Sequence, residues 1–207
     1  MGDLEIYESM SMAILQPFLV CLCALTVTLA ELRDETGEEI KTDDDIFKFL
    51  NASTKIWVYN TTEEREGDIT CRFDVRYNIS AKDTFFYRHN NTSPQELLNG
   101  TFVNWNDPEK TPYDAMYVTD MGGNPVTEEV LEYVSSDKRC AVVSVRLMRT
   151  DQTTVLREIR VPEEALESEP EDGCKNKFEK ILEVAKKNAK SHYSPRCKTM
   201  TSPSLAQ

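Results

Sequence analysis

The run Ile69-Thr-Cys-Arg-Phe-Asp-Val-Arg-Tyr-Asn-Ile79 decides the fold, because apolar and polar residues alternate strictly along it. A period of two is typical of a β-strand with one buried face and one solvated face. Asn78 opens an N-x-S/T glycosylation triplet, and a glycan must stand in solvent, so we expect the polar face to be the outside. The side chains then expected to point inward are Phe73, Val75, Tyr77 and Ile79.

Seven further runs are rich in aromatic or β-branched residues and are separated by polar turns. They span residues 55–60, 83–89, 100–105, 114–119, 128–134, 140–148 and 153–161. No helix of useful length separates them, so the pattern predicts an antiparallel up-and-down barrel rather than a parallel sheet.

Two helices flank the predicted strands. Thr42-Asp-Asp-Asp45 has the character of a helix start, with Thr42 as the cap, before a short apolar face. The acidic segment 162–173 is expected to be a linker. After it, residues 174–190 carry apolar side chains at helical spacing with lysines opposite, which predicts an amphipathic helix.

The two ends of the chain differ from the middle. Residues 12–30 carry no charge and end in small residues, so we expect residues 1–30 to be a secretory signal. A membrane anchor is the alternative, although the apolar stretch barely reaches the about 20 residues of a span and contains Pro17. Residues 31–41 are expected to be a mobile N-terminus and 199–207 a disordered tail, leaving 42–198 as one domain.

The composition is acidic, with 36 Asp and Glu against 24 Lys and Arg and a net charge of −12. Without residues 1–30, which hold three acids and no bases, 33 acids face 24 bases and the net charge is −9. Such a surface repels nucleic acid and anionic membranes, so neither is an expected partner. We expect a monomer.

Modification signals point to an oxidising compartment. Six glycosylation triplets begin at Asn51, Asn60, Asn78, Asn90, Asn91 and Asn99. Four cysteines follow the predicted signal, namely Cys71, Cys140, Cys174 and Cys197, and the sequence alone allows three pairings. Their gaps are too long for a metal site, so neither a metal nor another cofactor is expected.

An enzyme is not expected. The chain has no G-x-S-x-G elbow, no H-E-x-x-H pair and no phosphate-binding loop. We interpret His89 and His192 as surface residues rather than as catalytic bases or haem ligands.

The chain resembles the tick salivary lipocalins that include the histamine-binding proteins. The resemblance covers roughly residues 42–198. Its motifs are Asp45-Ile-Phe-Lys-Phe-Leu50 before Lys55-Ile-Trp57, Asp68-Ile-Thr-Cys71, Tyr133-Val-Ser-Ser-Asp-Lys-Arg-Cys-Ala-Val-Val143, Cys174-Lys-Asn-Lys-Phe178 and Tyr193-Ser-Pro-Arg-Cys197.

The resemblance implies a mainly β fold: an eight-stranded antiparallel lipocalin barrel with a short N-terminal helix and a C-terminal α-helix packed outside. It implies secretion in saliva and the capture of small host mediators. It also implies the disulfides Cys71–Cys197 and Cys140–Cys174. A bridge from Cys140 to the outer helix would turn Val143, Val145 and Leu147 toward the lumen.

The inner lining predicts the ligand class. Histamine-capturing relatives place carboxylates inside the barrel, yet Ala141 stands where they have an acid after the second cysteine. Glu158 is the one acid that could replace the acidic motif of their last strand, and its neighbours Arg157 and Arg160 favour a solvated face. The expected lining residues are Phe73, Val75, Tyr77, Ile79, Phe86, Met116, Val118, Tyr133, Val143, Val145 and Leu147. A lining without paired acids predicts a small apolar ligand such as a sterol, fatty acid or eicosanoid. The resemblance implies a role in host immune or inflammatory responses.

Two alternatives stay open at this point. One is a scavenger of histamine or another biogenic amine. The other is an immunomodulator that binds a host protein through a surface, with the acidic segment 163–172 or the loops around Asn90 as candidates.

Overall fold

The computed structural model describes residues 45–63, 71–91, 94–150 and 154–199. The predicted signal 1–30, the N-terminal segment 31–41, the expected cap Thr42 and nearly all of the tail 199–207 lie outside these residues. Among the residues described, no helix combines the length and the apolar character that a membrane span requires.

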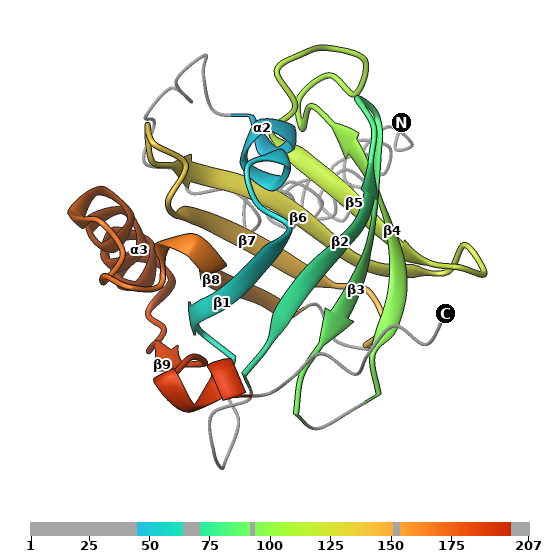
Figure 1. Cartoon of the computed structure of the whole chain (residues 1–207). Coiled ribbons are helices and arrows are strands. Elements are labelled where there is room, and N and C mark those ends of the chain that lie inside the picture. Colours follow the sequence, from blue (N-terminus) through green and yellow to red (C-terminus); the bar gives the residue numbers. More distant parts are fainter. Residues whose placement is uncertain (1–44, 64–70, 92–93, 151–153, 200–207) are drawn as a thin grey trace, which may run out of the picture.

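The predicted antiparallel barrel is confirmed (Figure 1). Its strands are β1 (Lys55–Thr61), β2 (Phe73–Ile79), β3 (Asp83–His89), β4 (Glu96–Val103), β5 (Ala115–Asp120), β6 (Pro125–Val134), β7 (Ala141–Leu147) and β8 (Thr154–Pro162). Each strand pairs antiparallel with the next, and β1 pairs with both β8 and β2, which closes the sheet on itself. Closure leaves no free edge among these eight strands.

The strands β2 to β4 contain two departures from the sequence prediction. β4 begins at Glu96 rather than at residue 100, so Asn99 lies within a strand and not in a loop. Glu96 and Asn99 stand on either side of Leu97 and Leu98, so the apolar run in the first half of the strand is too short to be recognised. β2 has a bulge between Arg76 and Asn78, which reverses the side-chain alternation within the strand.

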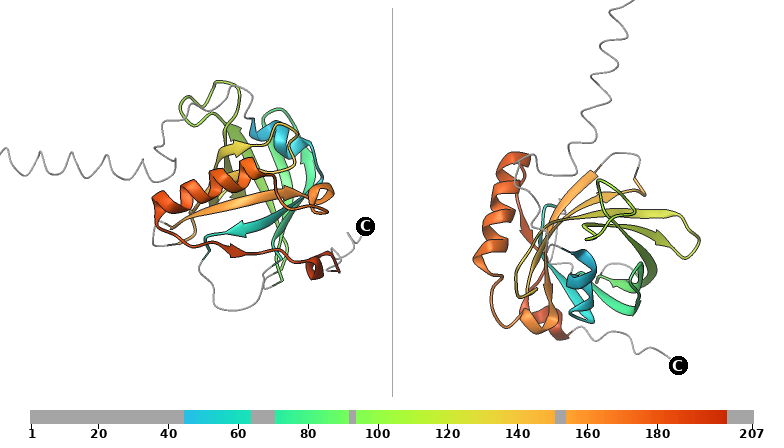
Figure 2. Two further views of the ribbon diagram at one scale, coloured as in Figure 1. Left: turned by 90° about the vertical axis from the view of Figure 1, so that its left-hand side faces the viewer. Right: turned by 90° about the horizontal axis from the view of Figure 1, so that it is seen from above.

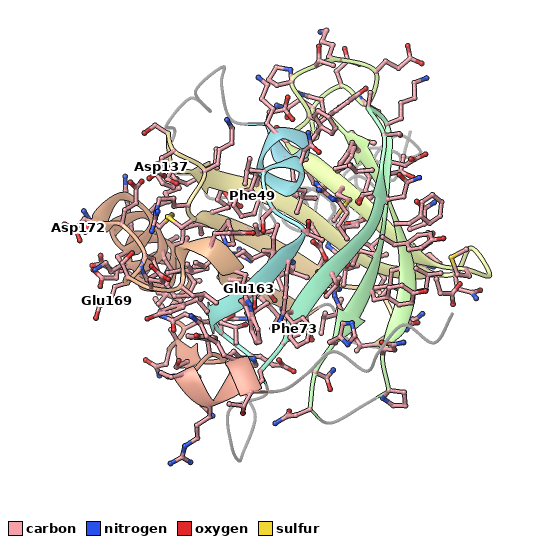
Figure 3. All side chains as sticks on the ribbon, viewed as in Figure 1. Phe49, Phe73, Asp137, Glu163, Glu169 and Asp172 are labelled. Carbon is pink, nitrogen blue, oxygen red and sulfur yellow. A yellow bond between two sulfur atoms is a disulfide. The ribbon has the colours of Figure 1, made fainter. Side chains whose placement is uncertain are left out.

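One end of the barrel is covered by helix α2 (Ile46–Asn51). The helix is capped by Asp45, whose side chain accepts a hydrogen bond from the Lys48 N–H, so the predicted cap at Thr42 is wrong. Ile46 and Phe49 are each about 1% exposed and belong to the inner apolar cluster. Figure 3 shows Phe49 beneath the helix, between α2 and the strands.

The outside of the barrel is covered on one side by helix α3 (Asp172–Ala185), as Figure 2 shows. Cys174, Phe178 and Ile181 form its buried face. The helix ends earlier than the predicted residue 190, because Lys186 adopts a left-handed conformation with φ 52°. The chain then forms β9 (Lys190–Ser191) beside the end of β1, and the 3₁₀ helix η2 (Pro195–Thr199).

The segment predicted as an acidic linker is partly structured. Residues Glu163–Ala165 form the 3₁₀ helix η1, and Ala165 and Leu166 are buried against the outside of the barrel. Figure 3 shows Glu169 near α3 and Glu163 by β1, where Glu163 accepts a hydrogen bond from Lys55 at 3.1 Å. The segment therefore attaches α3 to the barrel rather than letting it swing freely.

Two disulfides attach these outer elements. One joins Cys140 at the start of β7 to Cys174 in α3, and the other joins Cys71 to Cys197 in η2. These are the two pairs that the family resemblance implies. Because Phe73 proves to face outward, Cys71 has the same outward orientation as the tail that it binds.

We expect removal of either disulfide to destabilise the protein without abolishing the barrel. Cys140→Ala/Cys174→Ala should lower the free energy of unfolding by about 3–4 kcal/mol. The disulfide closes a loop across a separation of 34 residues, and its removal raises the conformational entropy of the unfolded chain. Cys71→Ala/Cys197→Ala, with a separation of 126 residues, should cost about 1 kcal/mol more. Urea denaturation of the three proteins measures both values, and the reverse order would contradict the loop-closure explanation.

Candidate ligand site in the barrel lumen

The inside of the barrel holds a continuous apolar cluster. Its fully buried members are Ile46, Phe49, Ile56, Phe86, Leu98, Phe102, Met116, Val118, Val126, Leu131, Ala141, Val143, Val145 and Leu156. Ile79 and Leu147 are half-buried against it. This cluster contains most of the predicted lining, namely Ile79, Phe86, Met116, Val118, Val143, Val145 and Leu147. Whether these residues touch a ligand stays a prediction.

The predicted orientation of β2 is wrong for its first half. Phe73 and Val75 belong to a separate cluster between the barrel, α3 and the C-terminal segment, and Tyr77 is 67% exposed. The sequence prediction used the glycosylation triplet at Asn78 to decide which face of the whole strand is outside. Because the bulge lies between Arg76 and Asn78, the outward position of Asn78 does not apply to the residues before it.

Tyr133 is also outside the lumen, contrary to the prediction. Leu131 points inward, but a bulge between Leu131 and Tyr133 turns the later side chain outward. There the Tyr133 hydroxyl donates a hydrogen bond to Glu171 at 2.9 Å and packs beneath the start of α3.

Charged residues occupy the lumen where an apolar lining was expected. Asp74 and Arg88 form a cross-strand pair between β2 and β3, with two hydrogen bonds of 2.9 and 2.8 Å. Arg88 also donates to Glu129 on β6 at 2.9 Å. Since β3 and β6 are not neighbours in the sheet, this contact crosses the inside of the barrel.

The contacts continue to the opposite wall. Arg160 on β8 donates to Glu129 at 2.6 Å and to Glu158 at 3.0 Å. Glu158 also accepts a hydrogen bond from Arg72, which precedes β2. We call these six residues the lumen charge chain: Arg72, Asp74, Arg88, Glu129, Glu158 and Arg160. Three arginines face three carboxylates, so the chain is neutral as a whole.

Burial and pairing together set the protonation of the charge chain. Burial alone would raise the pKa of Glu129, but attraction by Arg160 and Arg88 holds the pKa well below its usual range. Burial would likewise raise the pKa of Glu158, and Arg72 and Arg160 lower it. The Glu129 and Glu158 side chains are fully buried, so both carboxylates depend on these arginines for their charge.

The expectation of a lining without paired acids is therefore wrong, and so is the interpretation of Glu158 as solvated. The sequence contained a signal that would have found these residues. Arg88 has the parity of the inward Phe86, and Glu129 has the parity of the inward Leu131. A charge on the apolar face of a strand indicates a buried partner elsewhere.

One pocket opens beside the charge chain, between the end of α2 and strands β2 and β3. Its lining consists of Leu50, Ser53, Thr54, Ile56, Asp74, Arg76, Thr84, Phe86, Met116 and Arg160. The pocket is small: the centre of a water molecule can move within a volume of about 20 Å³. One water needs about 10–15 Å³ measured in this way, so the pocket holds one or two waters. A larger ligand requires lining side chains to move.

Met116 is the lining residue best suited to move. It lies over Gly100, where an added Cβ would stand 2.2 Å from the Met116 sulfur. Gly100 therefore leaves the space that the thioether occupies. Methionine is unbranched and adapts its shape at low cost, so it can change the size of this pocket.

Arg76 differs from the other arginines that face the lumen. Its Nη1 donates to the Leu50 carbonyl oxygen and to the Asn51 side-chain oxygen, each at 3.1 Å. Within the described residues it forms no ion pair with a carboxylate. It is thus a cation at the pocket held only by neutral acceptors at the C-terminal end of α2.

The remaining candidate chemistry is not supported by the geometry. Cys140, Glu171 and Cys174 lie close together, but both sulfurs are in a disulfide and offer no thiolate. The histidines are buried, contrary to the prediction of surface residues. His89 is 8% exposed and stacks on Phe73 at 4.7 Å, and His192 is 3% exposed beside Glu63.

The model of the tick histamine binding protein family matches residues 34–199. The chain belongs to this family. No curated protein matches.

Two solved structures are similar. A deswapped triple mutant of bovine odorant binding protein has 15% sequence identity and a TM-score of 0.43, covering 67% of this chain and 91% of its own. Lobster apocrustacyanin A1 has 10% identity and a TM-score of 0.42, covering 75% of this chain and 87% of its own. The family to which the chain belongs is one of small-ligand binding proteins.

We expect Glu129→Gln to destabilise the protein strongly. The variant keeps the shape of the side chain but leaves Arg88 and Arg160 buried with one negative charge fewer between them. The loss in the free energy of unfolding should be about 3–5 kcal/mol by urea denaturation. Glu96→Gln, which removes an exposed partner of Arg149, is the control and should cost about 1 kcal/mol or less. Equal effects of the two variants would contradict a buried role for Glu129.

We expect the stability to depend on pH through the same carboxylates. Their pKa values are lower in the folded than in the unfolded protein, so their stabilisation is complete above the unfolded pKa of about 4.3 and is lost as the pH falls below it. The free energy of unfolding should be nearly level from about pH 7 to 5 and fall steadily below about pH 4.5. Glu129→Gln should show a shallower fall, and a wild-type profile that stays level to about pH 3 would be inconsistent with this assignment.

Proposed function

We propose that this protein binds, in its barrel, a small ligand with an apolar body and an anionic head, of the fatty acid or eicosanoid class. Arg76 carries the proposal, because it is the cation at the pocket that no described carboxylate neutralises. A carboxylate carries a full negative charge and can accept two parallel hydrogen bonds from a guanidinium, which the separate neutral oxygens of Leu50 and Asn51 cannot do. A ligand carboxylate would therefore bind Arg76 more strongly than these oxygens do.

The apolar part of such a ligand has a suitable environment next to Arg76. Leu50, Ile56, Phe86 and Met116 line the same pocket. An acyl chain that buries about 400 Å² of apolar surface gains at most about 10 kcal/mol, and the cost of ordering the ligand and moving Met116 reduces this. A sterol would use the apolar contacts and leave Arg76 with neutral acceptors alone, so the pocket favours an acid.

Capture of an amine is the second candidate. The buried Glu129 and Glu158 and the histamine binding family favour it. Both carboxylates are already bound by arginines on two sides, however, so an amine would have to displace Arg72, Arg88 or Arg160. An arginine displaced within the barrel would then be buried without a counter-charge, at a cost of several kcal/mol.

The biological setting that we propose is a secreted salivary protein that removes a lipid mediator of the host's immune or inflammatory response. Two disulfides, six glycosylation triplets and the predicted signal at residues 1–30 support export. The family match supports an origin in tick saliva.

We expect Arg76→Ala to weaken fatty acid binding roughly 10- to 100-fold, because it removes a charge-assisted contact worth about 1.5–3 kcal/mol. Isothermal calorimetry with oleate measures the change. Arg139→Ala, at an exposed position outside the lumen, is the matched control and should bind as the wild type does.

The ligand head is tested in the same experiment. Oleyl alcohol, which has the same chain without the charge, should bind wild-type protein and Arg76→Ala equally. Tight binding of histamine that is lost in Glu158→Gln, together with no binding of oleate, would contradict the proposal and establish the amine alternative.

A further inference from the structure

The outer face of β2, β3 and β4 carries an uncovered aromatic surface. Tyr77 is 67% exposed and its ring meets Tyr87 edge-on, with 6.1 Å between the ring centroids. Phe85 and Tyr87 are half-buried and alternate with Phe86, which points into the lumen. We call Tyr77, Phe85 and Tyr87 the outer aromatic patch. These strands lie side by side on the side of the barrel away from α3 (Figure 1).

Two glycosylation asparagines flank the centre of this patch. Phe85 pairs with Asn78 on β2 and with Asn99 on β4, so the three side chains form one row across three strands. Directly opposed residues in such a row have Cβ atoms about 4.5–5.5 Å apart. Both asparagines point outward: Asn78 is exposed, and Asn99 lies between the inward Leu98 and Gly100.

The Asn78 side chain is bonded through its oxygen and not through the nitrogen that would carry a sugar. The Asn78 side-chain oxygen accepts a hydrogen bond from the Ile79 N–H at 2.9 Å. The Asn99 oxygen is buried and, within the described chain, has no hydrogen-bond partner.

We propose that N-glycans on Asn78 and Asn99 cover the outer aromatic patch, with their first sugar residues packed on Phe85 and Tyr87. A pyranose ring has an apolar face of C–H groups, which suits the face of an aromatic ring. An exposed aromatic surface on a secreted protein otherwise promotes association. The row Asn78–Phe85–Asn99 thus places an aromatic ring between two sequons, whereas the sequon asparagine Asn60 pairs with Ile159 and Ser191.

Glycopeptide mass spectrometry of protein secreted from eukaryotic cells tests occupancy. The proposal predicts glycan on both Asn78 and Asn99, and an unoccupied Asn78 or Asn99 would overturn it. The measurement needs no variant and does not depend on the ligand in the lumen.

Trimming of the folded, secreted protein tests the covering role. An endoglycosidase that leaves one N-acetylglucosamine should leave the protein monomeric, because the sugar that contacts Phe85 remains. An amidase that removes the whole glycan should shift the sedimentation profile toward dimers and larger species and increase binding of an apolar fluorescent dye. If the two treated samples behave alike, the first sugar does not cover the patch and the proposal fails.

Variants locate the effect. Asn78→Gln/Asn99→Gln should associate as the fully deglycosylated protein does, whereas Asn90→Gln/Asn91→Gln, the matched control, should stay monomeric. Adding Tyr77→Ser and Phe85→Ser to the first variant should restore the monomer, because the exposed aromatic rings are then absent. Association that persists in the Ser variants would assign the effect to another surface or to a partner, and would overturn the proposal.

Discussion

The lumen charge chain is the constraint on which the rest of the structure depends. Three arginines and three carboxylates are bonded to one another inside a barrel whose remaining lining is mainly apolar. They come from β3, β6, β8 and the start of β2. Each charge is costly to bury alone and tolerable when paired. The strands must therefore be closed in one register for the chain to exist.

The register of β2 shows this dependence. A slip by one residue would bring Phe73 and Val75 into the lumen, and Arg88 would lose Asp74. The same slip would break the aromatic contacts that Phe73 makes outside the barrel. Its ring centroid lies 4.5 Å from that of Trp57 and 4.7 Å from that of His89. Charges inside and aromatic rings outside thus specify the same arrangement. The elements that cover the barrel, α2 at one end and α3 on one side, are attached to it by buried apolar faces and by the disulfides (Figures 1 and 2).

The sequence predicted the barrel because alternation within each strand is a local property, and strand order follows from short turns. It did not predict which face of β2 is inside, because that depends on a bulge and on partners that are distant in the chain. Glu158 has Arg157 and Arg160 beside it in the sequence, which suggested a solvated face. Arg160 is in fact one of its buried partners, and the other, Arg72, lies 86 residues away. Bulges and long-range charge pairs have no local signature, so the lining was predicted well on β7 and poorly on β2 and β6.

The charge chain is neutral as a whole, which also limits the ligands that the barrel can bind. A charged ligand needs a side chain of opposite charge that is not already in an ion pair. Arg76 meets this condition for an anion, and no carboxylate of the charge chain meets it for a cation. Native mass spectrometry of the secreted protein, followed by identification of what co-purifies with it, tests this most directly. The account predicts a long-chain monocarboxylic acid, bound one per barrel. An amine in its place would contradict the account.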